Sequence, residues 1–335
     1  MRNVPVSVLD LAPVIAGGSA AQSFDRMVDL AQHAERWGYN RFWLAEHHGM
    51  PGIASSATSL LISHVAAGTR TIRVGSGGIM LPNHAPLVIA EQFGTLETLY
   101  PGRIDLGLGR APGSDQATMR AMRRGGGSDG SDFPLQLEEL QLYLKPVEHG
   151  PGRVRAIPGE GLDIPIWLLG SSGFSAHLAA QLGLPFSFAS HFAPDYLMPA
   201  LHIYRDNFRP SAVLEQPYVM IGLHAVAADN DEEAAKLATS QQQQFLNLIR
   251  GRPGQLSPPV DSMDELWTPE ERSVIHRQLG YSIAGGPETV RRKLDETLQT
   301  TQADELIITS HIYDHKARLR SYELIAQLAG LQPPQ

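Results

Sequence analysis

Arg110 stands out because it ends an apolar run that is interrupted by glycines, in the stretch PGRIDLGLGRAPG at 101–113. The alternation of apolar residues with Gly107 and Gly109 predicts a strand with one face open to a flat ligand. Pro112 then forbids continuation as strand, which places Arg110 at the strand's carboxyl tip. A planar guanidinium there suits a phosphate. The alternative is that Arg110 forms a structural ion pair and the glycines only relieve crowding.

A second unusual stretch, GSSG at 170–173, joins an apolar run to a helical pattern. Small residues at such a turn expose backbone N–H groups, and the helix dipole favours an anion. Gly170, Ser171, Ser172 and Ser175 therefore form a candidate phosphate site, with Arg110 as its positive charge. Alternatively, Ser172 or Ser175 only caps the helix and binds nothing.

The run AEHH places Glu46, His47 and His48 at the end of another strand-like segment. Strand alternation turns the two imidazoles to opposite sides, so that one faces a pocket and transfers protons near neutral pH. A metal site could draw on a wider set of residues, namely Glu46, His47, His84, His191 and His311. Because no HExxH or i, i+4 pair accompanies them, we expect no metal.

Glycines also interrupt the apolar run at 72–81, where Gly75, Gly77 and Gly78 occur within ten residues. Glycine in a central strand weakens packing, so the presence of three glycines in this strand needs an explanation. A rigid aromatic ligand lying against the backbone is one explanation. A bulge or a barrel corner is the other.

These residues follow buried strands that alternate with helices along the chain. We expect strands at 4–9, 41–46, 72–81, 104–108, 164–169, 185–189, 219–226 and 305–310. Eight such strands favour a (β/α)₈ TIM barrel over a doubly wound sheet, and barrel chemistry lies at the carboxyl ends of the strands. We expect one domain over 1–335, with irregular insertions at about 115–157 and 251–282. A helix capped by Ser23 and a short helix after Thr268 are also expected.

The composition limits the function to a soluble enzyme or binding protein. The 335 residues carry a formal charge of −8 and include no cysteine. Without basic runs, affinity for nucleic acid or anionic membranes is not expected. Neither a leader nor a membrane-spanning run is apparent, so we expect a cytoplasmic protein.

Several motifs together resemble the bacterial luciferase-like, flavin-dependent monooxygenases, in the uncharacterised single-component branch. The resemblance rests on AEHH at 45–48, VGSGGIMLPNHAP at 74–86, PGRIDLGLGRAPG and the AAQLGLP that follows GSSG. It covers nearly the whole chain and implies a (β/α)₈ barrel with insertions.

The resemblance implies an FMN site and a reaction. Gly77-Gly78 matches the family's non-proline cis peptide under the flavin ring, and Arg110 and the serines match its phosphate contacts. His47, beside Glu46, matches the histidine proposed as acid or base. Reduced FMN from an NAD(P)H:flavin reductase and O₂ would then oxygenate a small organic substrate, in a protein expected to be a homodimer. The alternatives are F420-dependent hydride transfer on the same scaffold and a non-catalytic flavin-binding subunit.

The sequence departs from the family's light emitters in two respects. It lacks the reactive cysteine near the flavin, and its glycine-rich first insertion carries no substrate signature. Both features argue against aldehyde oxidation and luminescence, while flavin binding stays expected. We also expect the stretch 115–155 to close over the site.

Overall fold

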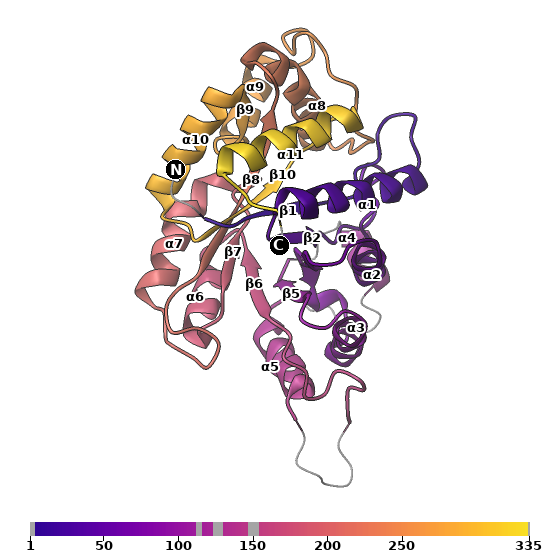
Figure 1. Ribbon diagram of the computed structural model, residues 1–335, viewed down its shortest axis with the longest axis vertical. Coiled ribbons are helices and arrows are strands. Elements are labelled where there is room, and N and C mark those ends of the chain that lie inside the picture. The colour runs from indigo at the N-terminus through magenta and orange to yellow at the C-terminus, as the bar shows by residue number, and fades with distance from the viewer. Residues whose placement is uncertain (1–3, 112–115, 123–129, 147–153, 334–335) are drawn as a thin grey trace.

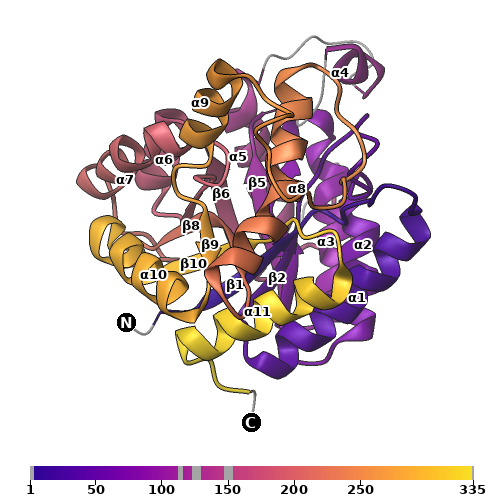
Figure 2. The ribbon, with the colours of Figure 1, turned by 90° about the horizontal axis from the view of Figure 1, so that it is seen from above.

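The computed structural model describes residues 4–111, 116–122, 130–146 and 154–333. Strands stand at the centre and helices surround them, as Figure 1 and the view from above in Figure 2 show. The strands are β1 Val6–Asp10, β2 Arg41–Leu44, β3 Arg73–Ser76, β4 Ile79–Met80, β5 Ile104–Gly109, β6 Ile166–Gly170, β7 Phe186–Phe188, β8 Val219–Ala227, β9 Ile283–Gly285 and β10 Glu305–Thr309.

The strands close into a parallel barrel, which confirms the predicted (β/α)₈ fold. The order is β1-β2-β3-β5-β6-β7-β8-β10, and β10 pairs in parallel with both β8 and β1. Parallel strands covered by helices are buried on both faces, which explains why they were recognisable as continuous apolar runs. β9 was not expected, since its three residues IAG carry little pattern. It extends the sheet only at the carboxyl end of β8.

The longer helices are α1 Ala20–Trp37, α2 Thr58–Gly68, α3 Pro86–Leu99, α4 Gln116–Met122, α5 Phe133–Leu144, α6 Gly173–Leu182, α7 Leu197–Asp206, α8 Asp231–Ile249, α9 Pro269–Gln278, α10 Pro287–Thr301 and α11 His315–Ala329. Short 3₁₀ turns occur at η1 Leu81–Asn83 and η2 Pro194–Tyr196. Within the described ranges, no helix is both long enough and apolar enough to cross a bilayer.

One prediction about a helix cap was wrong. Ser23 does not cap α1; the cap is Ser19, which forms a reciprocal capping box with Gln22, while the Ser23 hydroxyl donates to the Pro13 carbonyl. The strand expected at 72–81 with interruptions at its glycines is divided into β3 and β4, and the peptide between Gly77 and Gly78 is cis, as the resemblance implied. The glycines in this region also permit close packing, because a Cβ at Gly75 would collide with the Asp105 carbonyl oxygen.

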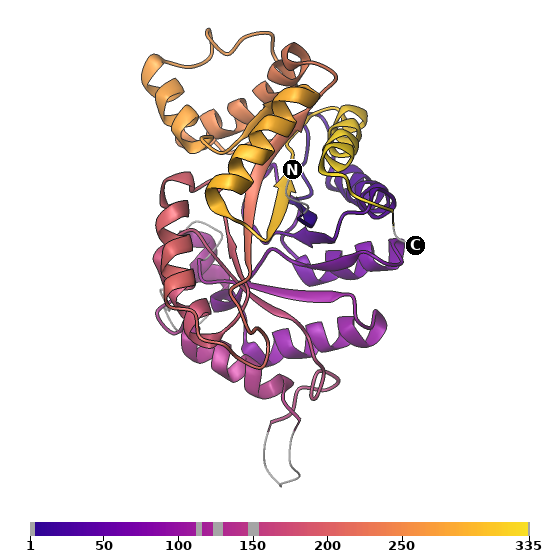
Figure 3. The ribbon, with the colours of Figure 1, turned by 60° about the vertical axis from the view of Figure 1, so that its left-hand side comes forward.

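The two insertions contain more regular structure than expected. The interval 115–157 includes α5, which packs against α3 as an ordinary helix of the barrel, so treating the whole interval as irregular was wrong. Leu137, Leu140 and Leu144 recur at helical spacing on the buried side of α5. The helix predicted after Thr268 is confirmed as α9, with Thr268 as its cap. Figure 3 shows α8, α9 and the loop between them gathered at one end of the molecule.

Charged residues fill the amino-terminal end of the barrel interior. Arg41 bonds both Glu305 and Asp105, and Arg73 bonds Asp105 from the next strand. Both carboxylates have no exposed surface. A cluster above them, formed by Leu9, Trp43, Ala45, Trp167, Met220 and Ile307, separates these charges from the opposite end.

Candidate functional site

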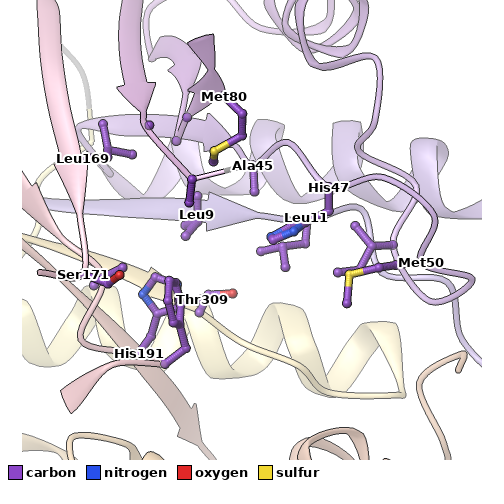
Figure 4. A pocket seen from close by; sticks show the side chains of 18 of the residues that line it. Leu9, Leu11, Ala45, His47, Met50, Met80, Leu169, Ser171, His191 and Thr309 are labelled. Carbon is purple, nitrogen blue, oxygen red and sulfur yellow. The ribbon is translucent and has the colours of Figure 1, made fainter. Parts of the chain in front are cut away.

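A cavity of about 720 Å³ opens at the carboxyl ends of the strands. That is the end of a TIM barrel where chemistry is expected. Its floor includes Leu9, Trp43 and Ile307, so the apolar cluster of the interior is also the bottom of the cavity. Figure 4 shows Ser171 and His191 on one side of the cavity and His47 with Met50 on the other.

Arg110 follows β5 directly and lines the cavity, where the sequence placed it. Its guanidinium carbon lies 4.1 Å from the centre of the Phe174 ring, a cation–π distance. No carboxylate of the described residues forms an ion pair with Arg110. The interpretation of Arg110 as a structural ion-pair residue therefore finds no partner carboxylate among the described residues.

The serines follow β6, at the amino terminus of α6, and line the same cavity. Ser172 has extended backbone geometry at the N-cap position, yet its hydroxyl makes no capping hydrogen bond. Ser175 is buried in the first turn and packs against Gly170, where a Cβ would meet the Ser175 side chain. The first turn of α6 thus faces Arg110's end of the cavity without a side-chain cap.

The glycines differ in what they do. Gly77, Gly78 and Gly109 line the cavity, as the flat-ligand interpretation requires. Gly107 does not line the cavity. A Cβ at this position would collide with the Ser76 carbonyl oxygen of the neighbouring strand. Close packing of β3 and β5 therefore explains Gly107, and the expectation that its face is open to a ligand was wrong.

Both His47 and His48 line the cavity, so the expectation that they face opposite sides was wrong. β2 ends at Leu44, and strand alternation does not extend over the loop that follows. Glu46 is fully buried and is not among the described residues that line the cavity. Its carboxylate accepts from His48 Nε2 at 2.8 Å, His84 Nε2 at 3.0 Å, the Met80 N–H at 2.8 Å and Asn83 Nδ2 at 3.2 Å.

Burial raises the pKa of the Glu46 carboxyl, but hydrogen bonds from His84, His48 and the Met80 N–H outweigh it, so the pKa lies below its usual value. A carboxyl group whose pKa is lower in the folded than in the unfolded protein stabilises the fold at pH values above the unfolded-state pKa. This stabilisation is lost as the pH falls through the folded-state pKa. We expect Glu46→Gln to lower the free energy of unfolding by about 1–3 kcal/mol at pH 7.

Urea unfolding at pH 7 and pH 3 measures this effect, with the exposed Glu138→Gln as the matched control. The difference between wild type and Glu46→Gln should be smaller at pH 3 than at pH 7, because the stability that depends on the ionised carboxylate is lost as pH falls through its lowered pKa. An equal difference at both pH values would contradict the charge-based explanation.

The second insertion helps to cover the cavity. Pro253, Gly254 and Gln278 line it, together with Gln244 and Phe245 of α8. Leu256 fixes this segment by backbone hydrogen bonds with Val14 and Ala16. By contrast, no described residue of 116–157 lines the cavity. Closure by that first insertion stays a prediction.

Three further imidazoles form the opposite wall, from His191, His224 and His311. The ring centres of His224 and His311 lie 5.0 Å apart, and those of His191 and His224 lie 5.6 Å apart. Burial, with the neighbouring histidines, lowers the pKa of His191 to about 3, and burial with Arg318 lowers that of His311 to about 3. These rings stay neutral at physiological pH.

The sequence missed His224 and Gln244 as cavity residues. A usable signal for His224 was the spacing of Met220, Gly222 and His224, which share the inward face of β8. The sequence predicts His191 and His311 at strand ends and among possible metal ligands, and the described residues include no group of side chains arranged to hold a metal ion. For Gln244 there was no signal, because α8 reaches the cavity only through the tertiary fold.

Curated relatives match the chain over nearly its full length. It is 60% identical over 327 residues to the uncharacterized protein YvbT of Bacillus subtilis, covering 98% of this chain and 97% of the relative. It is 55% identical to a luciferase-like monooxygenase of Escherichia coli, covering 96% of each. A third relative, the N-acetyl-S-alkylcysteine monooxygenase of Bacillus subtilis, is 33% identical, covering 96% of this chain and 97% of the relative.

Solved structures share the fold. The crystal structure of apo-MsnO8 is 34% identical, with a TM-score of 0.88, covering 99% of this chain and all of the other. The oxygenating constituent of 3,6-diketocamphane monooxygenase from Pseudomonas putida, in complex with FMN, has a TM-score of 0.75 at 19% identity and full coverage of both chains. An F420-dependent secondary alcohol dehydrogenase has a TM-score of 0.68 at 13% identity, covering 98% and 99%. At these two lower identities the likeness is one of fold.

The family model described as luciferase-like monooxygenase matches residues 4–305, which include the carboxyl ends of β1 to β8 but not that of β10. Together with relatives more than half identical over almost the whole length, this match establishes the family. The chain belongs to the luciferase-like monooxygenases.

Proposed function

We propose that this protein is an FMN-dependent monooxygenase that uses reduced FMN and O₂ to oxygenate a small organic substrate. The observation that carries the proposal is the convergence of Arg110, stacked on Phe174, with the uncapped first turn of α6 at one cavity. A guanidinium fork and a helix amino terminus are both complementary to a phosphate monoester.

The cavity residues fit a flavin in shape as well as in charge. A volume of about 720 Å³ lies within the range of pockets that enclose cofactor-sized ligands. Ala45, Gly77, Gly78 and Gly109 line the cavity after β2, between β3 and β4, and at the end of β5. Such small residues would let a flat ring approach the backbone, although a Cβ at each glycine would also meet protein atoms. Arg110, Ser171, Ser172 and Ser175 would hold the phosphate in this arrangement, with Gly170 permitting the turn.

Reduced FMN, when bound, supplies the electrons that activate O₂. The chain's own residues then have three tasks. The apolar floor excludes water, the glycine strand ends orient the ring, and His47 transfers protons beside it. Glu46 is proposed as a positioning residue instead of a group that touches the substrate, because it lies behind the cavity wall.

A separate NAD(P)H:flavin reductase is the proposed source of reduced FMN. One fold neighbour is itself named the oxygenating constituent of a larger monooxygenase, which supports a divided system. We also propose a homodimer, supported by the exposed Leu60 of α2 and by Val88 and Leu99 of α3. Exposed apolar side chains on neighbouring helices are typical of an interface.

Titration of the ligand-free protein tests the cofactor. FMN, anaerobically reduced FMN and F420 are added separately while absorbance or fluorescence is followed. We expect reduced FMN to bind with the highest affinity. Binding of F420 alone would replace oxygenation with hydride transfer, the alternative supported by the F420-dependent fold neighbour. Absence of binding by all three would contradict the cofactor assignment.

A further inference from the structure

A buried carboxylate stands behind one of the cavity imidazoles. His48 lines the cavity, and its Nε2 lies 2.8 Å from Oε1 of Glu46, which has no exposed surface. An ionised carboxylate only accepts hydrogen bonds, so Nε2 must carry the hydrogen. In the neutral ring this leaves the lone pair on Nδ1, and that nitrogen is not among the buried polar atoms that lack a partner. His48 thus has a fixed tautomer, its side chain is 16% exposed in the cavity lining, and Nδ1 is the ring nitrogen that can take up a proton.

The same carboxylate fixes the neighbouring segment of the chain. Glu46 Oε2 accepts from the Met80 N–H, and both oxygens accept from His84 Nε2 at 3.0 Å. Met80 lines the cavity just after the cis peptide at Gly77-Gly78. Glu46 therefore fixes the position of His48 relative to the Gly77-Gly78 segment, which would support the flavin ring.

The other wall offers no comparable group. His191, His224 and His311 are largely buried, and no carboxylate among the described residues pairs with any of them. His311 Nδ1 instead lies 2.6 Å from Oε1 of Gln244, a neutral partner. A neutral partner fixes a tautomer but gives little stabilisation to an imidazolium, whereas a carboxylate gives much.

We propose that His48, oriented and electrostatically supported by Glu46, is a proton-transferring residue of this site. Nδ1 takes up a proton from a group bound in the cavity, forming an imidazolium whose charge is balanced by Glu46, and later returns it. Glu46 stays ionised throughout and acts as a positioning residue. The inference rests on the proposed function, because it takes the bound group to be reduced flavin or the substrate. It makes His48 a second proton-transferring residue beside His47.

The groups around His48 define how pH acts on it. Glu46 faces it directly, His84 shares that carboxylate from the position after η1, and His47 adjoins it in the chain. Arg110 is the permanently charged side chain among the described residues that line the cavity. A change at Glu46 should therefore alter His48 more than a change at any other single position.

The first test needs no flavin. Proton NMR of the full-length protein should show imidazole N–H signals protected from exchange by bonds to Glu46. His48→Gln should remove one of them and Glu46→Gln should remove or shift it, whereas His47→Gln and the exposed His64→Gln should leave it in place. Retention of every protected imidazole signal in His48→Gln would overturn the Glu46–His48 pairing.

The second test uses the protein loaded with reduced FMN. The pH profile of reoxidation by O₂ should lose an inflection in His48→Gln and slow by about a hundredfold, the usual size of a general acid or base contribution. Added imidazole should restore the rate in His48→Ala. An unchanged profile and the absence of rescue would overturn the proposal.

The two levels of failure are distinguishable. If reduced FMN does not bind the wild type, the proposed function fails, and the NMR test still decides the Glu46–His48 pairing. If reduced FMN binds and only His47→Gln changes the pH profile, the function stands and the role of His48 is refuted.

Discussion

Arg110→Ala should weaken FMN binding by roughly 10- to 150-fold while leaving riboflavin binding nearly unchanged. Hydrogen bonds to a charged group contribute about 1.5–3 kcal/mol, and each 1.4 kcal/mol is tenfold in Kd. Riboflavin has the same ring but no phosphate, so the two ligands separate anchoring of the phosphate from support of the ring. Fluorescence titration of both ligands measures the effect.

The structure supplies matched controls for this experiment. Arg110→Lys keeps the positive charge but loses the planar fork that stacks on Phe174, so its FMN affinity should fall between those of wild type and Arg110→Ala. Arg120→Ala removes an exposed arginine of α4 and should change neither ligand. Equal weakening of FMN and riboflavin in Arg110→Ala would show that Arg110 supports the cavity and does not recognise phosphate.

Serine variants refine the same anion site. Ser171→Ala and Ser172→Ala each remove one neutral donor, so each should cost less FMN affinity than Arg110→Ala. The first-turn N–H groups of α6 remain in every variant, because they belong to the backbone. A residual preference for FMN over riboflavin in Arg110→Ala is therefore expected.

The barrel and one side of its cavity were predictable because their signals are local. Parallel strands buried on both faces appear as short apolar runs, and a polar residue placed at the end of such a run must lie at one rim of the barrel. Arg110 after β5 and the serines after β6 follow from this rule alone. No tertiary contact was needed to place them at the cavity.

Glu46 shows where local reasoning fails. Its position beside His47 predicted a catalytic group, but its partners His84, Asn83 and Met80 come from a segment more than thirty residues away. The same limit applies to Gln244, which approaches His311 from α8. Long-range pairing of polar side chains depends on loop geometry that no periodicity encodes.

The largest stability effect is expected from Asp105→Ala, in the charged layer below the cavity. Asp105 accepts from Arg41 Nη1 at 2.8 Å, from Arg73 Nη2 at 2.6 Å and Nε at 3.0 Å, and from Trp43 Nε1 at 3.1 Å. These donors come from β2 and β3, so one carboxylate of β5 joins three strands. Removing one partner of a buried ion pair typically costs about 3–5 kcal/mol, because the remaining charge is left uncompensated.

Urea unfolding of three variants separates charge from volume. Asp105→Asn keeps the volume but replaces an acceptor oxygen with a donor facing arginine, so it should lose most of the stability that Asp105→Ala loses. Glu296→Ala breaks an Arg–Glu pair of similar length, 3.0 Å, on the exposed face of α10 and should have little effect, since solvent screens such pairs. If Asp105→Asn were as stable as wild type, the loss in Asp105→Ala would reflect an empty cavity. Equally small losses of stability in the Asp105 and Glu296 variants would mean that water reaches the interior charges as it reaches surface charges. In that case the apolar cluster that includes Leu9, Trp43 and Ile307 would not seal the cavity floor.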